Sequence, residues 1–254
     1  MSKKIKPDYA YLNRKFMEGT DARPLRILSE YLLPDQQFKK EGIENMLVFF
    51  GSARAPSPED AKKLKQKNPK DPKLKLVKYY EAAENLAFKL AKWNQDTFGY
   101  NKYCVCSGAG PGIMMAANRG AHNAGAKTIG LSIELPFENV HNPYVSKELS
   151  FNFHYFFMRK FWFAYRSEAL IVMPGGFGTM DELFEMLTLI QTHKITKKFP
   201  IVLFGKKFWT DFINTSVLKK YGVISSQDLD CLFYTDSVNE AFTYITNAIL
   251  TKNA

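Results

Sequence analysis

The sequence predicts an α/β protein with a doubly wound, mostly parallel sheet of the Rossmann type and helices on both faces. Short apolar runs alternate with segments of helical periodicity along most of the chain, which is the pattern of successive βαβ units. Two of these runs end in glycine-rich turns, at residues 107–112 and 174–178, and each turn leads into a helical segment. Such turns are typical of the ligand-binding edge of a parallel sheet, where the N–H groups of a helix start favour negative charge.

The length of 254 residues and the hydrophobic content of 46% are sufficient for one large domain. We interpret residues 1–45, which are polar and mixed, as an N-terminal extension packed on the core, with a short amphipathic helix over residues 26–33. Residues 46–254 are expected to form a single Rossmann-like domain. Its first strand, residues 46–50, closes on Gly51 and Ser52, as expected at the ligand-binding end of a strand.

A lysine-rich insertion over residues 55–75 interrupts the domain soon after this strand. Four prolines flank seven lysines, and we interpret the segment as a solvated loop or a frayed helix. Contact with nucleic acid is the alternative, but the run lacks the interleaved aromatic residues that stack bases. Nucleic acid is therefore not the partner that the sequence favours.

The remaining strands and helices are expected to alternate regularly. A strand of the NAD-binding type would carry an acidic residue near its end, and residues 127–131 contain none, which counts against a simple NAD site. The expected strands are residues 103–106, 128–132, 149–153, 169–173, 200–204 and 231–234. The expected helices are residues 76–93, 113–121, 154–165, 179–190, 208–221 and 238–250.

The helix predicted over residues 154–165 is apolar nearly all round, so we expect it to be buried in the domain or across a subunit interface. Arg159 and Lys160 lie in its middle, where a charge is costly unless it is paired. An ion pair or an extended side chain that reaches the surface would explain Lys160. Arg159 is the better candidate for a ligand contact, because its planar guanidinium suits phosphate or carboxylate.

The stretch from residue 170 to residue 186 organises the predicted site. An apolar strand stops at Pro174, a glycine turn follows, and a helix is expected to begin at Thr179. Glu182 then falls in the first helical turn, beside a predicted phosphate site. Thr179 and Glu182 have the spacing of a capping box, in which the carboxylate would bond the backbone. A catalytic carboxylate is the alternative, and the pattern alone leaves both interpretations open.

Composition narrows the class of protein. The net charge of +10 suits an anionic partner such as a nucleotide, a phosphate or a nucleic acid, without choosing among them. Neither a signal peptide nor a membrane-spanning run is visible. Cys104 and Cys106 should share one face of a strand, and together with Cys231 they indicate free thiols in a reducing cytoplasm. The four histidines are scattered and make no metal pattern.

Three motifs stand in order along the chain: residues 107–114, residues 158–160 and residues 174–182. Together they resemble the LOG family, the cytokinin riboside 5′-monophosphate phosphoribohydrolases that were long described as lysine decarboxylases. The resemblance covers roughly residues 46–250. The N-terminal extension and the lysine-rich insertion make the chain more similar to the longer bacterial branch of that family.

The resemblance implies hydrolysis of the N-glycosidic bond of a nucleoside 5′-monophosphate, such as AMP or a prenylated AMP, to free base and ribose 5-phosphate. Arg159 and Glu182 match the catalytic pair of the family. The resemblance implies no cofactor and no metal, and we expect self-association as a homodimer or a larger oligomer. The expected substrate-binding residues are Gly51, Ser52, Gly108, Gly110, Glu138, Met158, Lys160, Gly175, Gly176, Gly178 and Thr179.

Elementary chemistry agrees with this reaction. Loss of a base from ribose builds positive charge at the sugar, and a nearby carboxylate can stabilise that charge and orient or deprotonate a water molecule. The sequence leaves two alternatives to consider. The fold can hold a nucleotide or a phosphorylated ligand without turnover, as a carrier or sensor. A pyridoxal-phosphate decarboxylase would need a lysine such as Lys194, but the pair of His193 and Lys194 is better explained as a solvated helix end.

Overall fold

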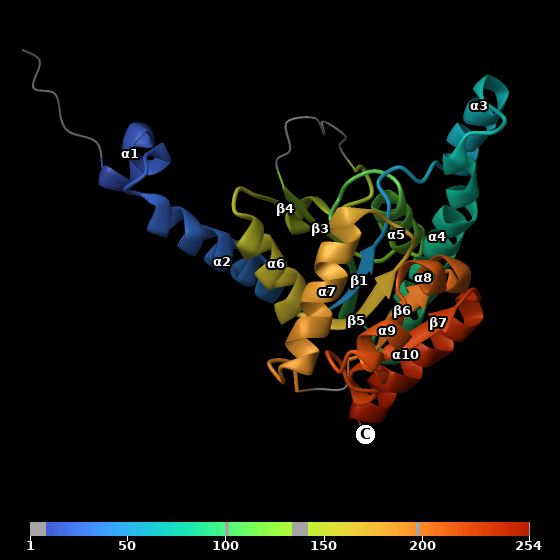
Figure 1. Ribbon diagram of the computed structural model, residues 1–254. Helices are drawn as coiled ribbons and strands as arrows, with labels where there is room; N and C mark the ends of the chain where they lie inside the picture. The colour runs from blue at the N-terminus through green and yellow to red at the C-terminus, as the bar shows by residue number, and fades with distance from the viewer. Residues whose placement is uncertain (1–8, 100–101, 134–141, 197–198, 254) are drawn as a thin grey trace, which may run out of the picture.

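A seven-stranded sheet, parallel throughout, forms the centre of the protein in the computed structural model (Figure 1). The structure describes residues 9–99, 102–133, 142–196 and 199–253. The strand order is β4-β3-β2-β1-β5-β6-β7, which confirms the predicted doubly wound α/β class. The strands are β1 (Asn45–Phe50), β2 (Tyr103–Ser107), β3 (Thr128–Ile133), β4 (Ser150–Phe153), β5 (Ser167–Val172), β6 (Ile201–Phe204) and β7 (Leu232–Thr235).

The order of the strands fixes where a ligand can bind. The chain starts at β1, adds β2, β3 and β4 on one side, and then returns to place β5 on the other side of β1. The connections after β1 and β5 therefore leave in opposite directions, and a crevice opens at the carboxyl ends of these two strands. Phe50 pairs with Val172 at this edge, so the two glycine-containing segments that follow them start side by side.

Side chains alternate across the strands and build one core on each face of the sheet. Leu47 and Phe49 of β1 face α4, α5 and α10, whereas Met46, Val48 and Phe50 face α2, α6, α7 and α8. The helices are α1 (Arg14–Glu18), α2 (Arg23–Lys40), α3 (Pro58–Lys67), α4 (Val77–Phe98), α5 (Ile113–Asn123), α6 (Phe156–Tyr165), α7 (Phe177–Gln191), α8 (Lys206–Phe212), α9 (Thr215–Lys220) and α10 (Val238–Asn253). Short 3₁₀ helices cover Ala10–Leu12, Pro72–Leu76, Lys147–Leu149 and Gln227–Leu229.

Helix α2 is much longer than the predicted helix over residues 26–33, and it continues through Pro34. A proline inside a helix frees the carbonyl four residues earlier, here that of Glu30. Nε1 of Trp162 on α6 donates a hydrogen bond to this carbonyl at 2.9 Å, so the freed acceptor is satisfied from outside the helix. This partner lies far away in the sequence, so local patterns could not predict that the helix continues.

The same residue of α2 also holds the start of α6. The Glu30 carboxylate accepts hydrogen bonds from the backbone N–H groups of His154 at 2.7 Å and Tyr155 at 3.3 Å, directly before the first turn of α6. Further along α2, Phe38 packs edge-on against Trp162 and Phe151. The second half of α2 is thus docked on α6, whereas α1 and the start of α2 reach away from the sheet (Figure 1).

The lysine-rich insertion contains a capped helix, α3, where we expected a solvated loop or a frayed helix. Helix α3 begins after Ser57, whose hydroxyl oxygen accepts from the N–H of Asp60 at 3.1 Å, and Pro58 occupies the first helical position. Its acidic residues lie in the first turn and its lysines later, as the helix dipole favours. The capping residue could have been recognised in the sequence, but the prolines nearby suggested a loop.

The structure refines two further expectations and confirms one. The helix predicted over residues 208–221 is two helices, α8 and α9, because Ile213 adopts an extended conformation between them. The aromatic helix α6 is only partly buried, since Phe156 and Phe157 are about half exposed. Cys104 and Cys106 are free thiols buried in the same core, as expected.

No helix among the described residues combines the length and the apolar character needed to cross a membrane.

We predict that docking of α2 contributes several kcal/mol to the stability of the whole domain. Phe38 is fully buried, and Phe38→Ala should lower the free energy of unfolding by about 3–5 kcal/mol. Gln36→Ala at an exposed position of the same helix is the matched control and should change stability little. Urea denaturation measures both, and equal small effects would show that α2 is dispensable for the fold.

Candidate functional site

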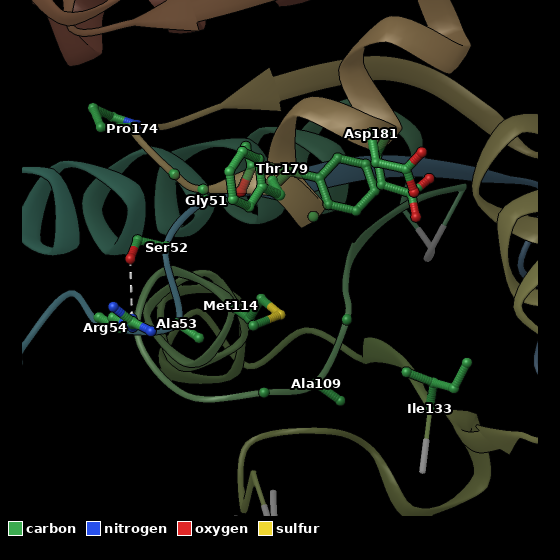
Figure 2. A pocket seen from close by; sticks show the side chains of 18 of the residues that line it. Gly51, Ser52, Ala53, Arg54, Ala109, Met114, Ile133, Pro174, Thr179 and Asp181 are labelled. Atoms are coloured by element: carbon green, nitrogen blue, oxygen red, sulfur yellow. Dashed lines mark hydrogen bonds between the residues drawn. The ribbon is translucent and has the colours of Figure 1, made fainter. Parts of the chain in front are cut away.

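A cavity of about 700 Å³ lies at the carboxyl edge of the sheet, where β1 and β5 diverge. The loop after β1 contributes Ser52 and Arg54, the turn before α5 contributes Ala109, and α7 contributes Thr179 and Asp181 (Figure 2). The ends of β3 and β5 and the start of α8 complete the wall. All of these elements reach the cavity because they follow neighbouring parallel strands.

Helix α7 begins earlier than predicted, and this changes the role of Glu182. Gly176 is the N-cap and Phe177 the first helical residue, and no side chain caps this end. Thr179 is the third helical residue, and its N–H bonds the carbonyl of Gly176 at 3.0 Å. Glu182 therefore lies in the second turn, too far along the helix to return to the N-cap. The capping-box interpretation is wrong.

The start of α7 keeps an open space in front of its backbone. The first N–H groups of a helix have no acceptor within the helix, and the helix dipole makes this end attractive to anions. A Cβ atom added to Gly176 or Gly178 would meet no protein atom within 4 Å, so neither glycine is required by internal packing. Gly175 differs, because its Cβ would collide with the side chain of Thr179.

Glu182 is held out of water at the edge of this cavity. It is only 5% exposed, and its Oε1 lies 3.9 Å from Nη1 of Arg159, which is an ion pair without a direct hydrogen bond. Burial raises the pKa of Glu182 to about 7, against the opposing attraction of Arg159 and Lys160. A carboxyl group with this pKa can exchange a proton near neutral pH.

Arg159 reaches the cavity from α6 and is fixed by several contacts. Its Nε donates a hydrogen bond of 2.7 Å to the carbonyl of Leu131 in β3, and its guanidinium lies 5.0 Å from the centre of the Phe163 ring. Its Nη2 lies over the backbone of Gly108, where a Cβ atom would approach to 2.6 Å. The first glycine motif is thus shaped to let the guanidinium lie against the turn.

A buried polar network fixes that first glycine turn. The Ser107 hydroxyl donates to Oδ1 of Asn118 at 2.6 Å and accepts from the N–H of Ala109 at 3.0 Å. Nδ2 of Asn142 donates to the same Oδ1 at 3.0 Å. Ala109 has a positive φ of 58°, a conformation that a non-glycine residue adopts only when its surroundings hold it.

The structure brings most of the predicted site residues together and leaves two of the described ones, Met158 and Lys160, outside the cavity lining. Met158 is buried in the core beneath α6. Lys160 forms ion pairs of 2.8 Å with Asp181 and Glu185, and so joins α6 to α7 instead of lining the cavity. Glu138 lies outside the described residues. The predicted residues that line the cavity are Gly51, Ser52, Gly108, Gly110, Arg159, Gly175, Gly176, Gly178, Thr179 and Glu182.

Several lining residues were not predicted from the sequence. Arg54 follows the end of β1 closely, so its position after a buried strand was a usable signal. Phe156, Phe177 and Phe208 give the cavity an aromatic wall, and Phe177 is 96% exposed. Phe208 comes from α8, and a pattern in the sequence could not relate it to the glycine turns.

Lys194 does not belong to this site. It is exposed and lies just beyond the C-terminal end of α7, whereas the cavity lies at the N-terminal end of that helix. A helix of this length spans roughly 20 Å. Among the described residues, no lysine lines the cavity. This position gives no support to the pyridoxal-phosphate alternative.

Solved structures show similar folds. The X-ray structure of TM1055, a structural-genomics target, matches with a TM-score of 0.51 and 20% sequence identity, over 80% of this chain and 99% of that chain. The molybdenum cofactor carrier protein from Chlamydomonas reinhardtii matches with a TM-score of 0.52 and 18% identity, over 82% of this chain and 99% of that chain. Identities this low show a shared fold and not a shared activity.

Sequence comparison is more specific. No curated protein matches the chain. The family model described as "Possible lysine decarboxylase" matches residues 114–245, which is just over half of the 254 residues and includes α6, α7 and Glu182. The match covers the second and third of the three motifs, residues 158–160 and 174–182, and the chain belongs to this family, the LOG family.

Proposed function

We propose that the protein hydrolyses the N-glycosidic bond of nucleoside 5′-monophosphates in the cytoplasm, releasing the free base and ribose 5-phosphate. The observation that carries the proposal is the carboxyl group of Glu182, which is buried beside the cavity with a pKa raised to about 7. A merely structural carboxylate gains nothing from such a position, because burial of its charge costs free energy.

In this proposal the start of α7 binds the phosphate. The open backbone at Gly176 and Gly178 accommodates the phosphate oxygens, and the helix dipole stabilises their charge. The ribose then lies towards Glu182, one turn further along the helix. Arg159 offsets the repulsion between the phosphate and this carboxylate, since its guanidinium lies 3.9 Å from Glu182 and lines the same cavity.

The chemistry is assigned to Glu182. As the bond from C1′ to the base breaks, its electron pair leaves with the base and positive charge develops on the ribose. The Glu182 carboxylate stabilises this charge and takes a proton from the water that adds to C1′. Glu182 then releases this proton to the solvent and the departing base takes up one proton from the solvent, so the reaction consumes one water molecule in total. The aromatic wall of Phe156, Phe177 and Phe208 offers apolar surface for a planar base.

A carrier function is the alternative, and similarity in fold to the molybdenum cofactor carrier protein favours it. A carrier would hold a phosphorylated ligand in the same cavity without turnover. The two functions differ in one measurement: separating the products of AMP and related monophosphates by chromatography. Free base together with ribose 5-phosphate supports the hydrolase, whereas tight binding without products supports the carrier.

We predict that Glu182→Gln abolishes most of the turnover. Glutamine keeps the size and polarity of the side chain but cannot accept a proton, so the release of base should fall by at least about a hundredfold. Glu81→Gln is the matched control, because it makes the same substitution at an exposed position of α4 that does not line the cavity. Equal activity of both variants and the wild type would contradict the role given to Glu182.

The same variant should be more stable than the wild type in mild alkali. The folded protein holds the Glu182 proton more tightly than the unfolded chain, because the pKa rises from 4.5 to about 7. The free energy of unfolding therefore falls as pH rises through this interval, by about 3 kcal/mol in total, and glutamine avoids the loss. Denaturation of both proteins at about pH 5 and about pH 8 measures the difference, and parallel pH dependence would contradict it.

We predict that Gly178→Ala weakens the binding of AMP without lowering the stability of the protein. The new Cβ meets no protein atom, and alanine in a helix is more favourable than glycine by up to about 1 kcal/mol, so the melting temperature should not fall. Binding of AMP, measured by calorimetry, should weaken because the methyl group occupies the space given to the phosphate. Gly175→Ala should instead lose stability through its collision with Thr179. Unchanged AMP binding by Gly178→Ala would contradict the phosphate position.

We also propose that the protein acts as a homodimer. Leu25, Leu28 and Leu32 on α2 are about half exposed, as are Phe156 and Phe157 on the neighbouring α6, which is more apolar surface than a monomer usually leaves open. Sedimentation equilibrium should give twice the chain mass of 29.1 kDa. A concentration-independent monomer would overturn this proposal without affecting the reaction.

A further inference from the structure

A second cavity, of about 570 Å³, adjoins the first one on the far side of the loop that follows β1. Ala53 and Arg54 line both cavities, so the two spaces meet at this loop. The second space is bounded by α3, the 3₁₀ helix after it, Tyr80 of α4 and the start of α5. We call it the basic groove, for the residues that line it.

The charge of the basic groove is strongly positive. Arg54, Lys63, Lys67, Lys73 and Arg119 line it, and Asp60 is the acidic residue that faces them. Arg119 is neutralised by a two-pronged ion pair with Glu84, and Lys63 lies 3.9 Å from Asp60. Within the described part of the chain, Arg54, Lys67 and Lys73 have no carboxylate oxygen within 4.0 Å.

This arrangement is unfavourable for the protein by itself. Lys63 and Lys67 are one turn apart on α3, where like charges repel. Two further cations converge on the same space from other segments: Arg54 from the loop after β1 and Lys73 from the 3₁₀ helix. A ligand that brings several negative charges removes the repulsion, whereas an apolar or cationic ligand does not.

We propose that the basic groove is a second anion site, which binds the distal phosphates of a nucleotide with a polyphosphate chain. The nucleoside part and the first phosphate occupy the first cavity, and the chain crosses the loop at Ala53 and Arg54. The assignment of the nucleoside rests on the function proposed above. The assignment of the phosphates rests on the groove alone, and a free polyphosphate tests it separately.

The outer face of α3 supplies a matched control. Lys62 and Lys65 lie on the same helix and carry the same charge as Lys63 and Lys67, but they do not line the groove. The double variants Lys63→Ala with Lys67→Ala and Lys62→Ala with Lys65→Ala therefore remove equal charge from opposite sides of one helix. Alanine favours a helix, so both variants should fold.

The experiment is calorimetric binding of inorganic tripolyphosphate, orthophosphate, AMP and ATP at physiological salt. We expect tripolyphosphate to bind the wild type more tightly than orthophosphate. The groove variant should lose roughly tenfold in tripolyphosphate affinity, as removal of two charge-assisted contacts near a surface implies, whereas the outer variant should match the wild type. ATP should bind more tightly than both AMP and tripolyphosphate.

Three results would overturn the proposal. An equal loss in both variants would show diffuse surface charge, and no preference for tripolyphosphate would show that the groove is not a phosphate site. A single-stranded oligonucleotide that binds more tightly than tripolyphosphate, with both variants weakened, would indicate a nucleic-acid surface. If tripolyphosphate binds in the groove but ATP binds no better, the phosphate site stands and the nucleotide assignment falls.

Discussion

The carboxyl group of Glu182 is buried at the carboxyl ends of β1 and β5, where the order of the strands reverses. Burying a charge there costs free energy, and the surrounding elements offset this cost. Burial alone would keep the group neutral, and Arg159 at 3.9 Å draws it back towards ionisation. The balance places its pKa near 7, where a small change in surroundings, such as a bound phosphate, alters its protonation. The open backbone at the start of α7 lies one turn away, so in our proposal a phosphate bound there affects proton exchange by Glu182.

The rest of the fold keeps the two charged groups in place. Arg159 depends on α6, and α6 depends on α2, because the Glu30 carboxylate holds the residues before its first turn and the Glu30 carbonyl binds Trp162. Lys160 joins α6 to α7 through Asp181 and Glu185, and so keeps Arg159 and Glu182 facing each other. Helix α2 therefore supports the candidate site through its packing on α6, and none of its residues lines the cavity.

Much of this architecture was predictable from local patterns. Apolar runs predicted the strands, since strands buried on both faces need apolar residues throughout, and glycine turns marked their ligand-binding ends. The predictions that failed have two physical causes. Some features depend on partners that are distant in the sequence, and one depends on where a helix begins. The course of α2 through Pro34 needs Trp162, and Phe208 joins the cavity only through the strand order. The capping interpretation of Glu182 failed because α7 starts at Phe177.

The most direct test is to follow adenine release from AMP between about pH 5 and pH 9. If a buried carboxylate with a pKa near 7 performs the reaction, the rate should rise with pH, with a midpoint of about 7, and then level off, because only the ionised form accepts a proton. A rate that changes little between about pH 5 and pH 9, as the ordinary value of 4.5 for this group implies, would show that burial does not tune Glu182. Absence of adenine at every pH, with AMP bound, would contradict the hydrolase and leave a carrier.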